Sequence, residues 1–146
     1  MIRRFGEPLA RGRRYTLRPG VYAVLLQGRR VLVTHQEEPE PEFQLPGGGI
    51  DPGENPLHAL YREVWEETGW TIARPRRIGA FRRFTYMPEY DLWAEKLCTI
   101  YRARPARQLG PPSEPGHSAI WMSVGEAAEV LANSGDRHFL LAALGA

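Results

Sequence analysis

Three glutamates lie within one helical turn of each other in the middle of the chain. Glu63, Glu66 and Glu67 have the spacing i, i+3, i+4, which places them on one face if the segment is helical. Neighbouring carboxylates on a helix repel one another by roughly 0.2–0.5 kcal/mol per pair, and only Arg62, four residues before Glu66, offers local relief. Alone, such a turn is usually a solvated face. Its oxygen ligands would nevertheless suit Mg²⁺, which commonly bridges to substrate phosphates.

The residues around these glutamates predict the helix that would carry them. Asn55 is a good N-cap, Pro56 suits the first helical position, and Gly69 is a natural stop. A face for the core recurs at helical spacing: Leu57, Leu60, Val64 and Thr68. Just before it, Gly47-Gly48-Gly49 allows a ligand to approach the main chain.

The wider spacing identifies a known motif. From Gly48, five residues lead to Glu54, and seven more lead to the run from Arg62 to Trp70, Arg-Glu-Val-Trp-Glu-Glu-Thr-Gly-Trp. Residues 48–70 therefore resemble the Nudix box of the MutT-like hydrolases at every fixed position. The last position is usually aliphatic, and Trp70 departs from it in size. The preceding residues 43–47 also resemble the family's approach to the box.

This resemblance implies an α+β Nudix fold, in which a mixed sheet lies between helices and the box forms a loop–helix–loop. It implies catalytic roles for Glu67 and Arg62, with Arg62 orienting the box carboxylates. The implied metal ligands are Glu63, Glu66, Glu67 and the carbonyl of Gly47, supported by Glu54 and Gly48. The implied cofactor is Mg²⁺, for which Mn²⁺ can substitute. Bound divalent cations neutralise phosphate charge and activate water, as hydrolysis of a pyrophosphate requires.

The general base is left open between three sources. Glu114 lies in a loop ahead of Trp121 and resembles the family's catalytic acid outside the box. Glu95 is a second candidate, although in a strand it could equally be a cross-strand partner of a Lys or Arg. A box glutamate is the third.

Other polar and aromatic residues give weaker signals. The four histidines, His35, His58, His117 and His138, show no metal-ligand spacing and are expected to be ordinary surface or cap residues. A base-stacking residue could be among the aromatic side chains Phe43, Phe84, Tyr86, Tyr90 and Trp93, most of which are expected to serve packing.

Strand and helix patterns alternate along the remaining chain, which predicts an α+β domain. A hairpin is expected from Val21–Leu26 and Arg30–Thr34, and strands from Ile78–Tyr86, Leu92–Ala103 and Ala119–Ser123. Loops are expected over residues 35–45 and 105–116, and helices over Val124–Ala132 and Asp136–Leu144.

Bulk properties fit one globular domain over residues 1–146, with 42% hydrophobic and 25% charged residues. No apolar run approaches the ~20 residues of a membrane span, and the N-terminus does not read as a secretory signal. Cys98 is the only cysteine, which makes a cytoplasmic setting the default expectation. A homo-oligomer is possible.

Charge is unevenly distributed although the net charge is only +2. Residues 1–30 carry eight arginines, and one or more of Arg11–Arg18 is hypothesised to reach the polyphosphate; the alternative is a solvated arm. Arginine-rich arms also allow nucleic-acid binding, which is not favoured.

The expected activity is hydrolysis of the pyrophosphate linkage of a nucleoside diphosphate derivative. The open substrates are nucleoside triphosphates, dinucleoside polyphosphates, ADP-ribose and nucleotide sugars. One alternative is a catalytically silent Nudix-fold nucleotide-binding module, although no box carboxylate is missing. Another is an RNA decapping pyrophosphohydrolase, which would use the arginine-rich N-terminus.

Overall fold

The longest early strand carries apolar residues on both of its sides, because helices cover both faces of the sheet to which it belongs. In β2 (Thr16–Gln27), Val21, Ala23 and Leu25 point to one face and Val24 to the other. All four side chains are fully buried. The computed structural model describes residues 2–145.

The strands of the described residues form a mixed sheet. Its order is β1-β6-β7-β2-β3-β4, with β5 paired to β2 and β8 paired to β3. The bounds are β1 Arg3–Arg4, β3 Arg30–Gln36, β4 Glu42–Gln44, β5 Gly47–Gly49, β6 Trp70–Met87, β7 Leu92–Gln108 and β8 His117–Ser123. β2 runs parallel to β7 but antiparallel to β3 and β5, and β6 and β7 form a long antiparallel hairpin.

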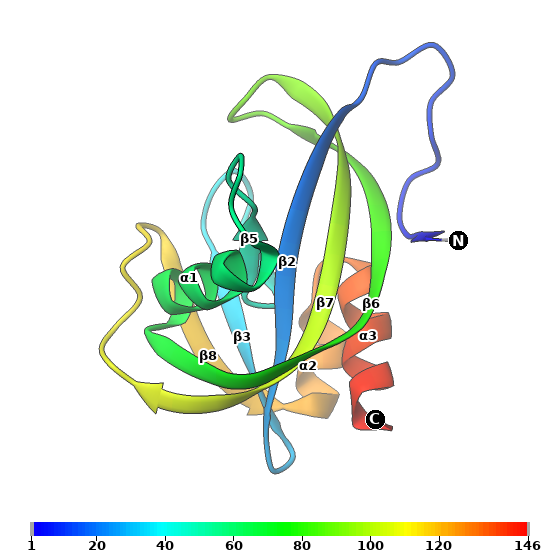
Figure 1. Cartoon of the computed structure of the whole chain (residues 1–146). Helices are drawn as coiled ribbons and strands as arrows, with labels where there is room; N and C mark the ends of the chain where they lie inside the picture. The colour runs from blue at the N-terminus through cyan, green and yellow to red at the C-terminus, as the bar shows by residue number, and fades with distance from the viewer. Residues whose placement is uncertain (1, 146) are drawn as a thin grey trace.

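Helices lie on the two faces of this sheet, as Figure 1 shows with α1 in front of β2 and with α2 and α3 behind it. α1 (Pro56–Thr68) buries Leu60 and Val64 in the cluster that contains Val21 and Leu25. α2 (Val124–Val130) and α3 (Ser134–Leu144) cover the other face, where Phe139 and its neighbours pack in a second cluster. The expected α+β fold with a mixed sheet between helices is thereby confirmed.

The ends of α1 lie where the sequence predicts them. The side chain of Asn55 accepts hydrogen bonds from the amides of Leu57 and His58, and Pro56 opens the helix. Gly69 ends it in a left-handed conformation, with φ 77°. Local capping chemistry is therefore sufficient to bound the box helix.

Two expected loops are partly strands. Residues 35–45 contain β4, which pairs with the end of β3, and residues 105–116 contain the end of β7, which pairs with Trp70–Ile72 of β6. The prolines and glutamates in these segments suggested loops, but pairing across the sheet outweighs local propensity. Pro105 is tolerated because its partner Ile72 sits at a register irregularity, where the ladder is already interrupted.

β2 and β3 separate soon after their shared turn. They pair only at Leu26 with Val31 and at Gln27 with Arg30, and β5 takes the edge of β2 at residues 20–22. The glycine segment of the box is thereby inserted into the sheet beside the opening between the strands. Within residues 2–145 no helix combines the length and apolar character that a membrane crossing needs.

Candidate active site

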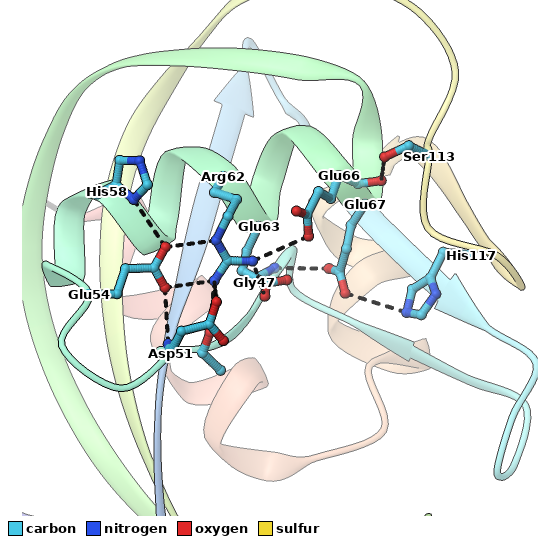
Figure 2. A network of polar contacts seen from close by, with 11 residues as sticks. Gly47, Asp51, Glu54, His58, Arg62, Glu63, Glu66, Glu67, Ser113 and His117 are labelled. Carbon is cyan, nitrogen blue, oxygen red and sulfur yellow. Dashed lines mark hydrogen bonds and ion pairs between the residues drawn. The ribbon is translucent and has the colours of Figure 1, made fainter.

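Arg62 is the centre of the polar network on α1 (Figure 2). Its guanidinium donates to both oxygens of Glu54, at 2.7 Å from Nε and 2.7 Å from Nη2. Its Nη1 donates to Glu63 at 2.9 Å and to Glu66 at 3.3 Å. A planar fork can hold several carboxylates at once, so this contact set agrees with the orienting role expected of Arg62.

The Arg62–Glu54 pair fixes the ionisation of both groups. Hydrogen bonding to Arg62 lowers the pKa of Glu54 to about 2, and the Asp51 amide, which donates to Glu54 at 3.0 Å, adds to this. The same contact raises the pKa of Arg62 above its ordinary value. Glu54 therefore stays charged, and His58, whose Nδ1 lies 3.0 Å from Glu54 Oε2, supports it from the exposed side.

Glu67 is the most enclosed carboxylate of the box, with 7% of the residue exposed. Its Oε1 accepts the amide hydrogen of Gly47 at 3.0 Å, and its Oε2 lies 3.4 Å from Nε2 of His117. The pKa of Glu67 is raised to about 8, mainly by burial and also by the charges of neighbouring glutamates, although the Gly47 hydrogen bond lowers it. A cation beside this side chain would stabilise its charged form.

The glycines at 47 and 48 allow the box loop to approach its surroundings closely. A Cβ on Gly47 would lie 2.1 Å from the Val21 carbonyl oxygen, and a Cβ on Gly48 would lie 2.4 Å from Oε2 of Glu63. A side chain at either position would therefore displace β2 or the Glu63 carboxylate. This explains physically why the motif needs glycine there.

Glu114 lies near the box because the C-terminal end of α1 is hydrogen-bonded to the main chain of its loop. The carbonyl of Glu66 accepts the amide hydrogens of Ser113 at 2.9 Å and of Glu114 at 3.0 Å. Carbonyls in the last turn of a helix lack helical partners and need such donors. The charge of Glu114 contributes to the raised pKa values of Glu63 and Glu67, so these carboxylates share one electrostatic environment.

A cavity of about 1230 Å³ opens at this cluster. The site residues that line it are Gly47, Gly48, Glu54, Glu63, Glu67 and Glu114. Glu66 is not among its lining residues and faces Arg62 instead. These carboxylates come from α1, from the segment just before it and from the loop before β8.

The donor set suits a divalent cation, although the side chains are not arranged around one. In residues 2–145 no three His, Cys, Asp or Glu side chains are grouped closely enough to hold an ion, because Glu63 turns to Arg62 and Glu67 to Gly47 and His117. Glu63 nevertheless has its pKa raised by burial, with Glu66 and Glu114 adding to the increase. Carboxylate oxygens that repel one another in a cavity are the ligands that Mg²⁺ prefers.

The structure separates the remaining sequence candidates. Glu95 lies 3.7 Å from Arg82 in an ion pair across the β6–β7 hairpin, and it does not line the cavity. Tyr86, Tyr90 and Trp93 line the cavity. Of the aromatic candidates, Phe43 packs on His35 and Phe84 is buried.

Within the basic segment 11–18, only Arg18 lines the cavity among the arginines. Arg13 lies over the ring of Trp93, with Cζ 3.7 Å from the ring centre. Arg11, Arg13 and Arg14 are all exposed, whereas Arg18 is half-buried. The hypothesis that this segment reaches the substrate is thereby narrowed to Arg18.

Two residues of the site were not identified from the sequence. His117 was expected to be an ordinary surface or cap residue, but it contacts Glu67, and its side chain is 17% exposed. Asp136 accepts the amide hydrogen of Leu45 at 3.1 Å in a buried contact between α3 and the approach to the box. Neither has a local signal, because β-sheet pairing and helix packing bring both in from the C-terminal part of the chain.

Trp70 replaces the usual aliphatic residue without disturbing the box. Its ring meets the ring of Trp121 edge to face, with centres 5.7 Å apart, at the rim of the core under α1. The larger side chain is accommodated by an aromatic partner on β8.

Comparison with solved structures shows that the fold is shared with known proteins. The MutT NUDIX hydrolase of Burkholderia pseudomallei superposes with a TM-score of 0.72 at 20% identity, covering 86% of this chain and 96% of that one. At this identity the likeness concerns the fold alone.

Sequence comparison gives partial relatives and a family. A putative 8-oxo-dGTP diphosphatase of Bacillus subtilis is 32% identical over 74 residues, 51% of this chain and 50% of that protein. An RNA pyrophosphohydrolase of Cereibacter sphaeroides is 46% identical over 86 residues, 58% of this chain and 51% of that protein. The chain thus spans about half the length of these curated relatives. The NUDIX domain model matches residues 16–143, and the chain therefore belongs to the NUDIX family.

Proposed function

We propose that this chain is a divalent-metal-dependent pyrophosphohydrolase acting on a nucleoside diphosphate derivative. The observation that carries the proposal is that Glu63, Glu67 and Glu114 line one large cavity together with Gly47 and Gly48, and that their charges raise one another's pKa values in part. The names of the relatives, a diphosphatase and an RNA pyrophosphohydrolase, support the same class of reaction.

Glu63, Glu66, Glu67 and the carbonyl of Gly47 are the proposed ligands of Mg²⁺, or of Mn²⁺ in its place. The ion, when bound, supplies charge neutralisation for the diphosphate and activation of water. Glu66 would need only to turn from Arg62, because its contact at 3.3 Å is the longest of the hydrogen bonds between Arg62 and a carboxylate.

The chain's own contacts keep these ligands in place. Arg62, held on both oxygens of Glu54, positions Glu63. The amide of Gly47 fixes one oxygen of Glu67 and leaves the other facing His117. These hydrogen bonds hold Glu63 and Glu67 near their proposed positions, whereas Glu66 would turn toward the ion.

Glu114 is the proposed general base. It lines the cavity outside the Arg62 network, and its loop is anchored on the Glu66 carbonyl. A carboxylate that is not occupied by the guanidinium can take the proton of an attacking water. Glu95 is set aside for this role because it pairs with Arg82 away from the cavity.

The proposal is tested by a screen of nucleotide substrates with Mg²⁺, read out as released phosphate or nucleotide. The panel includes nucleoside triphosphates, dinucleoside polyphosphates, ADP-ribose, nucleotide sugars and 5′-triphosphorylated RNA. We expect turnover of at least one substrate, its loss in chelator and its recovery with Mg²⁺ or Mn²⁺. Turnover that persists in chelator would exclude the metal-dependent reaction.

Glu67→Gln tests the assignment of Glu67 as a metal ligand in the same screen. We expect a loss of orders of magnitude in rate with little change in Tm, because the amide oxygen can still accept the Gly47 hydrogen bond and a neutral amide replaces a carboxyl that is mostly protonated below its pKa of about 8. A catalytically silent binding module would bind nucleotide equally with and without this change and would turn over none of the panel.

A further inference from the structure

Three cationic side chains lie in register across three neighbouring strands. Arg18 of β2 pairs with Lys96 of β7, and Lys96 pairs with Arg83 of β6. Residues matched in this way point to the same face of a sheet, and all three line the cavity that contains the box carboxylates. We refer to Arg18, Lys96 and Arg83 as the cationic rung.

The cationic rung is unfavourable for the stability of the empty protein. Like charges directly opposite one another in a sheet are destabilising. Within residues 2–145 neither Lys96 nor Arg83 has a side-chain hydrogen bond or an ion pair. Arg18 lies over the ring of Tyr90, with Cζ 4.6 Å from the ring centre. All three side chains are half-buried, so solvent screens their repulsion only in part.

The acidic residues near the cationic rung do not neutralise it. Glu95, the neighbour of Lys96 in sequence, points to the opposite face and pairs with Arg82. Glu7 lines the cavity but forms no ion pair with a described residue. Asp136 of α3 is buried, and burial raises its pKa to about 6 although Arg83 and Lys96 lower it, so its single charge offsets only part of the three positive charges. The charge of the cationic rung is therefore directed to the cavity.

The cationic rung lies one step along the sheet from the box. Gly20, two residues after Arg18 in β2, pairs with Gly49 of β5. Two residues of a strand span about 7 Å. The row of residues between the box and the cationic rung carries Gly20 and the buried Cys98 and Phe81. The same cavity is therefore lined by the box carboxylates Glu63 and Glu67 and by the three cations of the rung.

We propose that the cationic rung binds a phosphate of the substrate beyond the two that flank the hydrolysed bond. The chain would then select substrates with three or more consecutive phosphates. This inference rests on the proposed pyrophosphohydrolase function. Arg and Lys form strong charge-assisted hydrogen bonds with phosphate oxygens. ADP-ribose and nucleotide sugars have only two phosphates, and they would place a neutral sugar or nucleoside against the three cations.

The first test compares two substrates in four proteins. The ratio of kcat/KM for a nucleoside triphosphate to kcat/KM for ADP-ribose is measured with Mg²⁺ in wild type, Lys96→Gln, Arg83→Gln and Arg104→Gln. Arg104 is exposed on the same strand as Lys96 and does not line the cavity, so its replacement controls for net charge. We expect the ratio to favour the triphosphate in wild type and to fall about tenfold in each cationic-rung variant, as one lost charge-assisted contact predicts.

The lower kcat/KM of the cationic-rung variants should result from a higher KM for the triphosphate. Arg104→Gln should retain the wild-type ratio. Removing one of several like charges should leave Tm unchanged or higher. A ratio that stays at the wild-type value in Lys96→Gln and Arg83→Gln would overturn the inference. Equal losses for both substrates would also overturn it, because they would place the cations on the two cleaved phosphates.

A binding experiment distinguishes failure of this inference from failure of the proposed function. Calorimetric titration with inorganic triphosphate and with pyrophosphate in chelator requires no catalysis. We expect wild type to bind triphosphate more tightly than pyrophosphate and Lys96→Gln to lose that difference. Equal affinities in wild type would overturn the inference. A wild-type protein that binds triphosphate in this way but hydrolyses no nucleotide would instead refute the pyrophosphohydrolase activity.

Discussion

At the scale of single residues, the box depends on the number and planarity of the donors of Arg62. One guanidinium contacts Glu54, Glu63 and Glu66 and also donates to the Gly49 carbonyl at 3.3 Å. Lysine could not replace it, because a single ammonium cannot form the two-point contact with Glu54 while holding Glu63. Neither Glu67 nor Glu114 is among the contacts of Arg62, and both line the cavity.

Replacement of Glu114 by Gln tests the proposed base. We expect kcat to fall by about two to four orders of magnitude with little change in KM, because proton transfer contributes only in the transition state. The Tm should be unaffected, since it is the main-chain amide of Glu114 that binds the Glu66 carbonyl. Steady-state kinetics on the best substrate provide the measurement.

Glu95→Gln is the matched control for Glu114→Gln. It removes the same charge from a residue that pairs with Arg82 outside the cavity. We expect near wild-type turnover. An unchanged rate in Glu114→Gln would assign the base to a box glutamate, and a steep loss in Glu95→Gln would reopen the role set aside for that residue.

At the scale of elements, the end of α1 fixes the position of the loop that carries Glu114. Gly69 has φ 77°, and its carbonyl accepts the Leu109 amide hydrogen at 2.8 Å. A Cβ at this position would lie 1.8 Å from the Gly110 carbonyl oxygen. The helix end and the start of the Glu114 loop are therefore packed too closely for any side chain at residue 69.

Gly69→Ala should therefore be costly for both stability and activity. The left-handed conformation alone costs roughly 1–2 kcal/mol for alanine, and the clash with the main chain adds about 1–3 kcal/mol. Chemical denaturation measures the change. Gly28→Ala is the control, because Gly28 has φ 62° but a Cβ there would meet no atom within 4 Å. Equal destabilisation of the two variants would show that the contact with Gly110 has no energetic consequence.

The contact between Asp136 of α3 and the Leu45 amide, just before the box, should make the stability of the protein depend on pH. Asp136 is buried, and its pKa is raised from 3.8 to about 6 by burial, although the Leu45 hydrogen bond, Arg83 and Lys96 lower it. A carboxyl with a raised pKa in the folded state destabilises that state when ionised. This penalty is absent below about pH 4, grows as the pH rises through 6 and is complete above it.

Asp136→Asn should remove that penalty while retaining an oxygen for the Leu45 amide. The free energy of unfolding of wild type minus that of the variant should fall by about 2–3 kcal/mol between pH 4 and pH 7. Denaturation curves at several pH values give this difference directly. A difference that does not vary with pH would contradict the raised pKa of Asp136.

At the scale of the whole molecule, the candidate site combines residues from elements that are far apart in the sequence. Carboxylates from α1 and from the loop before β8 face β5, and β5 is paired to the central strand β2. A cation held by residues from several elements binds the folded chain and not the unfolded one. Binding is therefore linked to global stability.

Mg²⁺ should accordingly raise Tm, and chelator should lower it to the value of the metal-free protein. A concentration 100 times Kd would add about 2.7 kcal/mol to the free energy of unfolding. Thermal unfolding with and without Mg²⁺ measures this shift, which should be much smaller in Glu67→Gln. A shift of equal size in both proteins would place the ion elsewhere on the chain.

The sequence by itself determined the features that depend on neighbouring residues. Asn55, Pro56 and Gly69 bound α1 through local hydrogen bonds and local conformation, so the helix and the shared face of its glutamates could be predicted. The fixed spacing from Gly48 to Trp70 indicated the family for the same reason, since the motif lies within one continuous segment.

Only the tertiary structure decided what depends on register between distant strands. His117 reaches Glu67 because β8 pairs with β3, and Arg18, Lys96 and Arg83 form one row because β2, β7 and β6 pair at those positions. A shift of one residue in any of these pairings would turn the side chains to the opposite face. Register is fixed by the packing of both faces of the whole sheet, and no short segment of the sequence contains that information.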